Sequence, residues 1–202
     1  QTGASLALVS DAGAPLVSDP GFRLVAAARA AGIMISPIPG PSSLIAALSV
    51  AGLPSDRFAF EGFLPAKAGA RRERLAEFAS EPRTLIFYES GNRIEDALAD
   101  AVAVIRADRP ASIARELTKL FETVLGGTLA ELHARVVADA DQRKGEFVLL
   151  IQGVGDDADA KLVEGRRVYA KLIEHLPPST AAKLAAEITG APRKGLYGGD
   201  RG

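Results

Sequence analysis

Two loops rich in glycine, proline, serine and aspartate have the residue types that hold a nucleotide-like ligand. The first follows an apolar segment at residues 6–9 and begins with Ser10 and Asp11, and the second has the sequence PIPGPSS over residues 37–43. Small, rigid residues at the carboxyl end of a strand leave room for a ligand, and the helix that follows offers unpaired amides to an anion or hydroxyl. Neither loop contains Gly-Lys-Ser/Thr or GxGxxG, which argues against nucleoside triphosphates and NAD. For the first loop alone, simple turn chemistry is the competing interpretation.

The composition excludes several other kinds of chemistry. The chain has 202 residues, of which 48% are hydrophobic and 24% charged, as in a globular protein of one or two domains. It has no cysteine and only two histidines, His133 and His175, so we expect no disulfide, no metal site and no Ser-His-Asp triad. The sequence lacks a membrane-spanning segment and a signal peptide, which predicts a cytoplasmic protein without a membrane partner. Because the net charge is −1, any binding to nucleic acid depends on local basic patches.

Strand and helix patterns alternate along the chain and predict an α/β fold. We expect strands at residues 6–9, 33–38, 58–63, 84–88, 111–115 and 147–152. We expect helices from Pro20, capped by Asp19, to Gly32, and at residues 43–49, 71–79, 94–106, 128–138, 166–175 and 179–189. A hinge at residues 53–57 and a polar linker at residues 153–165 divide the chain into an α/β subdomain (1–56), a second α/β subdomain with mixed strand directions (57–153), and a linker with a small C-terminal helical unit (154–202).

Eight motifs occur in order from about Leu6 to Tyr197 and carry a family resemblance. They are SDAGAPLVSDPG, PIPGPSS, GLPSDRF, GFLPAKAGARRERL, RTLIFYES, ARELTKLFE, GTLAEL and KGEFVLLIQG. Each is moderately specific, but together they resemble the small-subunit ribosomal RNA methyltransferases of the tetrapyrrole methylase superfamily. The resemblance implies S-adenosylmethionine as methyl donor, a cytidine ribose 2′-hydroxyl of 16S ribosomal RNA as acceptor, a donor cleft between two α/β subdomains, and a homodimer.

The resemblance also implies which positions bind the donor, and they lie on four segments. These positions are Ser10, Asp11 and Ala14 in the first loop, Ser42 and Ser43 in the second, Tyr88 at a strand end, and Leu117 through its backbone.

The catalytic residues are harder to assign because this reaction needs few of them. Methyl transfer from a sulfonium is an in-line displacement without a metal, and positioning supplies much of the rate. Since a ribose hydroxyl is a weak acid, a base or a nearby cation would help to form the alkoxide. The candidates are charged residues at two strand ends, namely Glu89, Arg93, Arg115, Glu116, Lys119 and Glu122. Ion pairs that brace the strand ends are the alternative, and the identity of the base stays open.

Two further segments are candidates for contact with RNA. The densest basic run consists of Lys67, Arg71, Arg72 and Arg74. Such a run is usually a solvated helix face, but an RNA substrate makes phosphate contact equally plausible. Residues 181–197 have the spacing of a helix-turn-helix, which we interpret as an accessory to substrate recognition. A plain helical pair and a DNA reader are the alternatives.

Two features depart from the family pattern. The family's segment before the first loop is absent, so residues 1–56 form the remainder of a subdomain, with an expected unpaired strand edge and an incomplete donor pocket. Ser90-Gly91-Asn92-Arg93 stands where the family commonly has Ser-Pro-His-Arg, and Asn92 cannot act as an acid or base. The competing functions are a corrinoid or porphyrin methylase and an inactive fragment that binds RNA or dimerises. The LTKLFE run and the basic GARRER run favour RNA.

Overall fold

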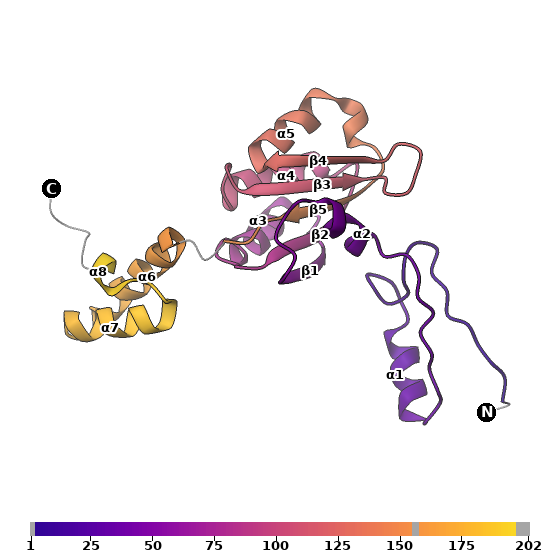
Figure 1. Ribbon diagram of the computed structural model, residues 1–202, viewed down its shortest axis with the longest axis horizontal. Coiled ribbons are helices and arrows are strands. Elements are labelled where there is room, and N and C mark those ends of the chain that lie inside the picture. Colours follow the sequence, from indigo (N-terminus) through magenta and orange to yellow (C-terminus); the bar gives the residue numbers. More distant parts are fainter. Residues whose placement is uncertain (1–2, 155–157, 197–202) are drawn as a thin grey trace.

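The computed structural model describes residues 3–154 and 158–196, which form an N-terminal arm, a central α/β unit and a C-terminal helical unit (Figure 1). The arm and the segment after it contain α1 (Phe22–Ala30) and α2 (Ser43–Val50). The central unit contains β1 (Phe58–Phe63), α3 (Ala68–Glu77), β2 (Thr84–Ser90), α4 (Ile94–Val104), β3 (Pro110–Arg115), β4 (Thr123–Thr128), α5 (Leu129–Ala138), a short 3-10 helix (Ala140–Arg143) and β5 (Glu146–Ile151). The C-terminal unit contains α6 (Ala158–Leu172), α7 (Pro178–Thr189) and α8 (Arg193–Leu196).

The central sheet has the strand order β1-β2-β5-β3-β4 and mixed directions, as the sequence predicts. β1 and β2 are parallel because α3 crosses between them, whereas β5 runs antiparallel to both β2 and β3. β3 and β4 form an antiparallel hairpin. β5 lies in the middle of the sheet, and residues 147–151 are all buried, so this strand is a continuous apolar run.

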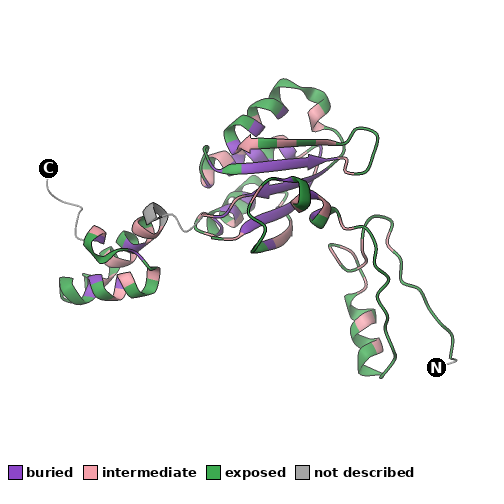
Figure 2. Cartoon of the chain, viewed as in Figure 1, coloured by how far each residue is buried: buried purple, intermediate pink, exposed green. Residues whose placement is uncertain are grey.

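The two faces of the sheet have different coverings. Helices α3, α4 and α5 cover one face, where Phe87, Leu98, Leu132 and Leu149 belong to the largest hydrophobic cluster. The opposite face carries a smaller cluster under α2. Buried residues concentrate in the sheet and in the helices packed on its first face (Figure 2). We call this second face, which α3, α4 and α5 leave uncovered and on which α2 packs, the open face.

The N-terminal arm differs from the prediction. Residues 6–9 and 33–38 form no strand, so both predicted strands are wrong, and α1 begins at Phe22 after Gly21 instead of at Pro20. α1 has no buried residue, and both Leu6 and Met34 are 91% exposed. The physical reason is that a strand is stable only when a neighbour pairs with it, and no described strand lies beside either segment. The arm instead extends away from the sheet (Figure 1).

Two other boundaries also differ from the prediction. β4 contains Gly126 and Gly127, which favour a turn by local propensity, yet pairing with β3 makes the segment a strand. α6 begins at Ala158, so most of the predicted linker at residues 153–165 is helical, while residues 155–157 lie outside the described residues.

The C-terminal helices pack on one another through small side chains. Ala182, Ala185 and Ala191 form their buried core together with Leu196. α7 ends at Thr189, and the next residue, Gly190, is a left-handed C-cap with a φ of 69°. None of the helices in the described part of the chain has both the length and the apolar run that crossing a bilayer requires.

Candidate functional site

Tyr88 is the centre of the polar and aromatic groups on the open face. Strand alternation places Ile86 and Tyr88 on this face, while Phe87 points into the helix-covered core. The hydroxyl of Ser43 donates to Tyr88 Oη at 2.9 Å, which joins α2 to β2 across 45 positions of sequence. Leu117 packs against the same hydrophobic cluster. The structure therefore brings three of the predicted donor-binding residues together.

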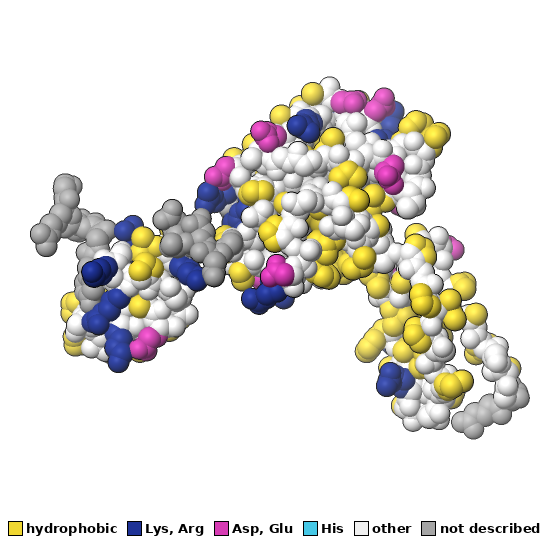
Figure 3. Space-filling view, viewed as in Figure 1, with side chains coloured by type: hydrophobic (Ala, Val, Ile, Leu, Met, Phe, Trp, Pro, Cys, Tyr) yellow, Lys and Arg dark blue, Asp and Glu magenta, His cyan; other side chains and the backbone are white. Residues whose placement is uncertain are grey.

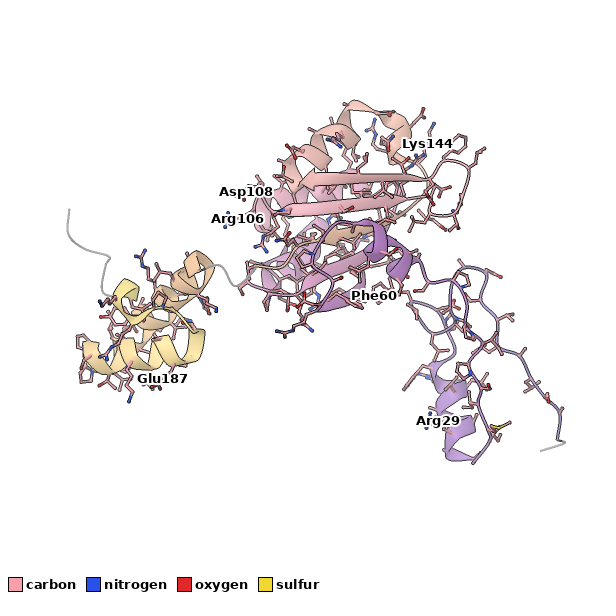
Figure 4. All side chains as sticks on the ribbon, in the orientation of Figure 1. Arg29, Phe60, Arg106, Asp108, Lys144 and Glu187 are labelled. Atoms are coloured by element: carbon pink, nitrogen blue, oxygen red, sulfur yellow. The ribbon has the colours of Figure 1, made fainter. Side chains whose placement is uncertain are left out.

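Two phenylalanines that sequence reasoning missed enclose the ring of Tyr88. The Phe60 and Phe63 rings lie edge-on to it, with centroids 4.7 and 5.7 Å away, and Phe60 is labelled on β1 in Figure 4. The β1–β2 register shifts between Phe60 and Gly62, and Gly62 has a φ of 69°. Bulges of this kind re-aim side chains near functional sites. Gly62 was the one sequence signal that could have pointed to these two phenylalanines, since a glycine inside a strand pattern indicates a bulge.

The two N-terminal loops lie next to one another. A Cβ at Gly13 would be 3.7 Å from the carbonyl oxygen of Pro41, and a Cβ at Gly62 would be 3.7 Å from Ser18 Oγ. Ser10 is bonded locally, with its hydroxyl donating to the Ala12 carbonyl at 3.1 Å. The first loop thus runs past the second loop toward β1.

The remaining loop positions differ in exposure. Asp11 is exposed, while Ala14 and Ser42 are half-buried. Ser42 is the N-cap of α2, but its side chain makes no capping hydrogen bond. The first-turn amides of α2 are therefore free of a side-chain cap and able to hold a carboxylate.

Glu89 and Arg93 lie on the other side of the sheet from Tyr88. Strand alternation turns the Glu89 side chain toward the helix-covered face, where it is fully buried and 3.3 Å from Arg93 Nη2. Arg93 also donates to the Leu64 carbonyl. Among the described residues, Glu89 Oε2 and Arg93 Nε find no hydrogen-bond partner. The pair braces the junction of β2 and α4, so we remove both residues from the proposed catalytic set.

We expect Glu89→Gln to stabilise the protein at neutral pH. Burial raises the pKa of Glu89 above 4.5, and the hydrogen bond from the Ser90 amide and the charge of Arg93 offset this only in part. The folded state therefore holds this proton where the unfolded chain has lost it, and stability falls as the pH rises through 4.5 toward the raised value. Thermal unfolding should give the variant a higher melting temperature than the parent at pH 7 and an equal one near pH 4. A variant that melts lower at pH 7 would show that the charged pair is stabilising.

The loop after β3 is held by an internal network. Glu116 Oε1 accepts from Lys119 Nζ and from the Glu146 amide, both at 2.9 Å, and the Thr118 amide donates to Glu122 at 2.6 Å. The hydrogen bond between Glu116 and Lys119 lowers the pKa of the Glu116 carboxyl and raises the pKa of the Lys119 amine, so both side chains are charged at neutral pH. Glu116 and Thr118 have positive φ values of 49° and 64°. A carboxylate held by two hydrogen bonds in this way is a weak general base.

Arg115 is a structural residue of this loop. Its side chain is buried and donates to the carbonyls of Lys144, at 2.7 Å, and Phe121, at 3.4 Å. A surface depression of about 320 Å³ lies beside it and is lined by Arg115, Glu116, Phe121, Asp141, Lys144 and Gly145. Phe121 is 66% exposed at its rim. Lys144, labelled in Figure 4, lies at the end of the sheet near the β3–β4 turn.

The predicted basic run on α3 is largely neutralised within the fold. Arg71 and Arg72 both donate through Nε to Asp100 at 2.6 Å, and the Arg71 side chain is only 4% exposed. Arg74 pairs with Glu61 at 2.7 Å and also with Glu77. Lys67, at the start of α3, is exposed. Because a buried guanidinium cannot reach a phosphate, Arg71 is removed from the proposed RNA contacts.

A metal site is not found in the part of the chain that the structure describes. Residues 3–154 and 158–196 contain no group of three or more His, Cys, Asp or Glu side chains that could hold an ion.

Comparison with known proteins identifies the family. Residues 1–133 match the Tetrapyrrole (Corrin/Porphyrin) Methylases, and residues 159–198 match the RsmI C-terminal HTH domain. The chain is 68% identical over 198 residues to Ribosomal RNA small subunit methyltransferase I of Xylella fastidiosa, covering 98% of this chain and 72% of that protein. It is 53% identical over 199 residues to the protein of the same name from Pseudomonas aeruginosa, covering 98% and 71%.

The fold is also similar to that of a solved methyltransferase. The methyltransferase CobJ superposes with a TM-score of 0.51 at 21% identity, covering 70% of this chain and 62% of that chain. This likeness concerns the fold alone. From the family matches and the high identity to its relatives, the chain belongs to the tetrapyrrole methylases and, among them, to the ribosomal RNA small subunit methyltransferase I family.

Proposed function

We propose that this protein transfers the methyl group of S-adenosylmethionine to the 2′-hydroxyl of a cytidine ribose in 16S ribosomal RNA. The observation that carries the proposal is the 68% identity, over 98% of the chain, to a relative named for methylation of small-subunit ribosomal RNA. The two family matches cover residues 1–133 and 159–198. A corrinoid or porphyrin methylase is the weaker alternative, because it rests only on the description of the family that matches residues 1–133.

The residues of the open face fit this donor. The uncapped first turn of α2 offers amides to its carboxylate, and the aromatic group around Tyr88 offers an apolar wall to its adenine. Ser10, Asp11 and Ala14 would complete the site from the first loop, and the backbone at Leu117 from the opposite side. When bound, the donor supplies a methyl group on a positively charged sulfur, ready for in-line displacement.

We assign activation of the ribose 2′-hydroxyl to its placement next to the methyl group and to charged residues of the loop after β3. Glu116 and Lys119 are both charged and hydrogen-bonded to each other, so neither is set up to take the hydroxyl proton alone. Lys119 would favour the alkoxide as a nearby cation, and Glu122, which accepts from the Thr118 amide at 2.6 Å, is the other carboxylate of the loop. Correct placement of hydroxyl and methyl group supplies most of the rate in this scheme.

The partners follow from the substrate. We infer that the protein acts on 16S ribosomal RNA within the small ribosomal subunit, in the cytoplasm where ribosomes are assembled, and that it works as a homodimer like the family that it resembles. Size measurement in solution by light scattering tests the homodimer directly.

Tritiated methyl transfer to isolated small ribosomal subunits tests the function. We expect label to enter 16S ribosomal RNA and to be recovered, after nuclease digestion, as 2′-O-methylcytidine. Large ribosomal subunits serve as the control and should stay unlabelled. Label on a base would contradict the acceptor assignment, and an absence of transfer to either subunit would contradict the proposed activity.

A further inference from the structure

The C-terminal helices carry a net positive charge, whereas the central unit does not. Residues 158–196 contain seven Lys and Arg against four Asp and Glu, whereas residues 57–153 contain fourteen against fifteen. The overall charge of −1 therefore hides a cationic unit. Figure 3 shows Lys and Arg side chains spread over the visible face of these helices.

The cations of α3 and those of the C-terminal unit have different partners. Arg71, Arg72 and Arg74 all face carboxylates within the central unit. Arg166, Arg193 and Lys194 are exposed, and none of the three forms an ion pair with any carboxylate of the described residues. A cation without a carboxylate partner can bind phosphate with a net gain in electrostatic free energy, because no existing ion pair has to break.

The fold holds these three cations around one short segment. Arg166 Nε donates to the Gly195 carbonyl at 3.1 Å, which fastens α6 to α8, and Arg193 Nη2 donates to the Ser179 carbonyl at 3.1 Å. A Cβ at Gly165 would meet the side chains of Ala191 and Leu196 at 2.5 and 2.7 Å. The glycine therefore lets α6 pack closely against the segment that carries Arg193 and Lys194.

We infer that Arg166, Arg193 and Lys194, which we call the α8 basic cluster, bind the phosphate backbone of the RNA substrate. Each arginine uses one donor for a backbone carbonyl and keeps further N–H groups for the two-point contact that guanidinium makes with phosphate. Lys194 adds a third point charge. The inference rests on the proposed function for the choice of RNA, and it moves the principal RNA contact from α3 to the C-terminal unit.

Salt-dependent RNA binding of a charge-neutral triple variant tests the cluster. In Arg166→Gln, Arg193→Gln, Lys194→Gln, glutamine keeps helix propensity while three charges are lost. Binding of a fluorescein-labelled RNA hairpin is measured by anisotropy without methyl donor, across about 50 to 200 mM KCl. We expect affinity to fall at least about tenfold at the low-salt end, and the slope of log affinity against log salt to become shallower by about 2.

A matched variant removes the same charge from another part of the protein. Arg83→Gln, Arg106→Gln, Arg143→Gln takes three cations that pair with carboxylates in the central unit. We expect it to change affinity less than about twofold, since these charges are already neutralised. Far-UV circular dichroism checks that both triple variants keep their helices. If the cluster variant loses helix, Lys194→Gln alone must still lower the slope by about 0.7.

Several results would overturn the inference. They are an unchanged slope in the cluster variant, an equal loss in the matched variant, and tighter binding to a DNA duplex of matched length than to the RNA. If the cluster variant binds protein-free 16S ribosomal RNA normally but small ribosomal subunits weakly, the partner is a ribosomal protein and the inference is wrong. Because no donor is present, a failure of methyl transfer with intact cluster-dependent RNA binding would contradict only the proposed function.

Discussion

Asp100→Asn is expected to lower the free energy of unfolding of the central unit by about 3–5 kcal/mol. The Asp100 side chain is 4% exposed and accepts from both Arg71 and Arg72 at 2.6 Å, and Arg71 is equally buried. The substitution keeps the shape of the side chain but leaves the buried Arg71 guanidinium with only the exposed carboxylate of Asp96, 3.8 Å away, as a counter-charge. Urea denaturation followed by far-UV circular dichroism measures the loss.

The pH dependence of the same variant gives a second measure of this ion pair. Burial opposes the charged form of Asp100, but the hydrogen bonds from Arg72 and Arg71 outweigh it and hold the pKa below 3.8. The charged form of Asp100 therefore contributes its full stabilisation of the folded state above pH 3.8. That contribution is lost as the pH falls below 3.8 and through the lowered pKa of the folded state. The stability difference between Asp100→Asn and the parent should shrink only in that acid range.

The control for this prediction is an exposed ion pair of similar geometry. Asp108 pairs with Arg106 at 2.7 Å, but the two side chains are 65% and 62% exposed. Figure 4 shows both residues at the end of the sheet away from Lys144. Asp108→Asn should lower the free energy of unfolding far less than Asp100→Asn does, because solvent screens exposed pairs. Equal losses from the two substitutions would show that burial of the Asp100 pair contributes nothing.

Tyr88→Ala is expected to weaken binding of S-adenosylmethionine at least about tenfold, or roughly 1.4 kcal/mol. The substitution removes the ring that Phe60 and Phe63 enclose and the acceptor of the Ser43 hydroxyl. Loss of this wall opens the proposed donor site to water. Calorimetric titration with the donor measures the dissociation constant.

Tyr88→Phe serves as the matched control for this prediction. It keeps the ring and loses only the hydroxyl that Ser43 contacts. We therefore expect the free energy of unfolding to fall by the worth of a single hydrogen bond, about 0.5–1.5 kcal/mol, with donor binding little changed. Thermal unfolding of both variants separates donor binding from folding. If Tyr88→Ala binds the donor as tightly as the parent, the open face is not the donor site.

The central unit shows how far local pattern predicts a fold. The strands at 58–63 and 84–88, the helix from Ile94 and the strand closing at residues 147–152 all form close to the predicted boundaries. Their signals are strong because each buries a periodic apolar face against the sheet. The arm gives the opposite result. Residues 6–9 have a strand's composition but no partner in the described chain, so the composition produces no strand.

The candidate site shows a similar division. The motifs identified the residue types of a donor site and the family, and Ser43, Tyr88 and Leu117 do converge on one face. Glu89 directly follows Tyr88 in sequence, yet alternation along β2 sends it to the opposite face. Phe60 and Phe63 carried no functional signal by themselves, because a bulge at Gly62 sets their approach to Tyr88.

By itself the sequence determined the family, the methyl-transfer chemistry that the family implies, and the order of helices and strands in the central unit. These follow from residue identity, motif order and apolar periodicity, all of which are local properties of the chain. Only the tertiary structure decided which charges are available for function. On α3, the three arginines pair with Asp100, Glu61 and Glu77, whereas Arg166, Arg193 and Lys194 form no ion pair with a carboxylate of the described residues. The physical reason is that folding brings Asp100 and Glu61 to this run from 13 to 29 positions away, at separations that no local pattern encodes.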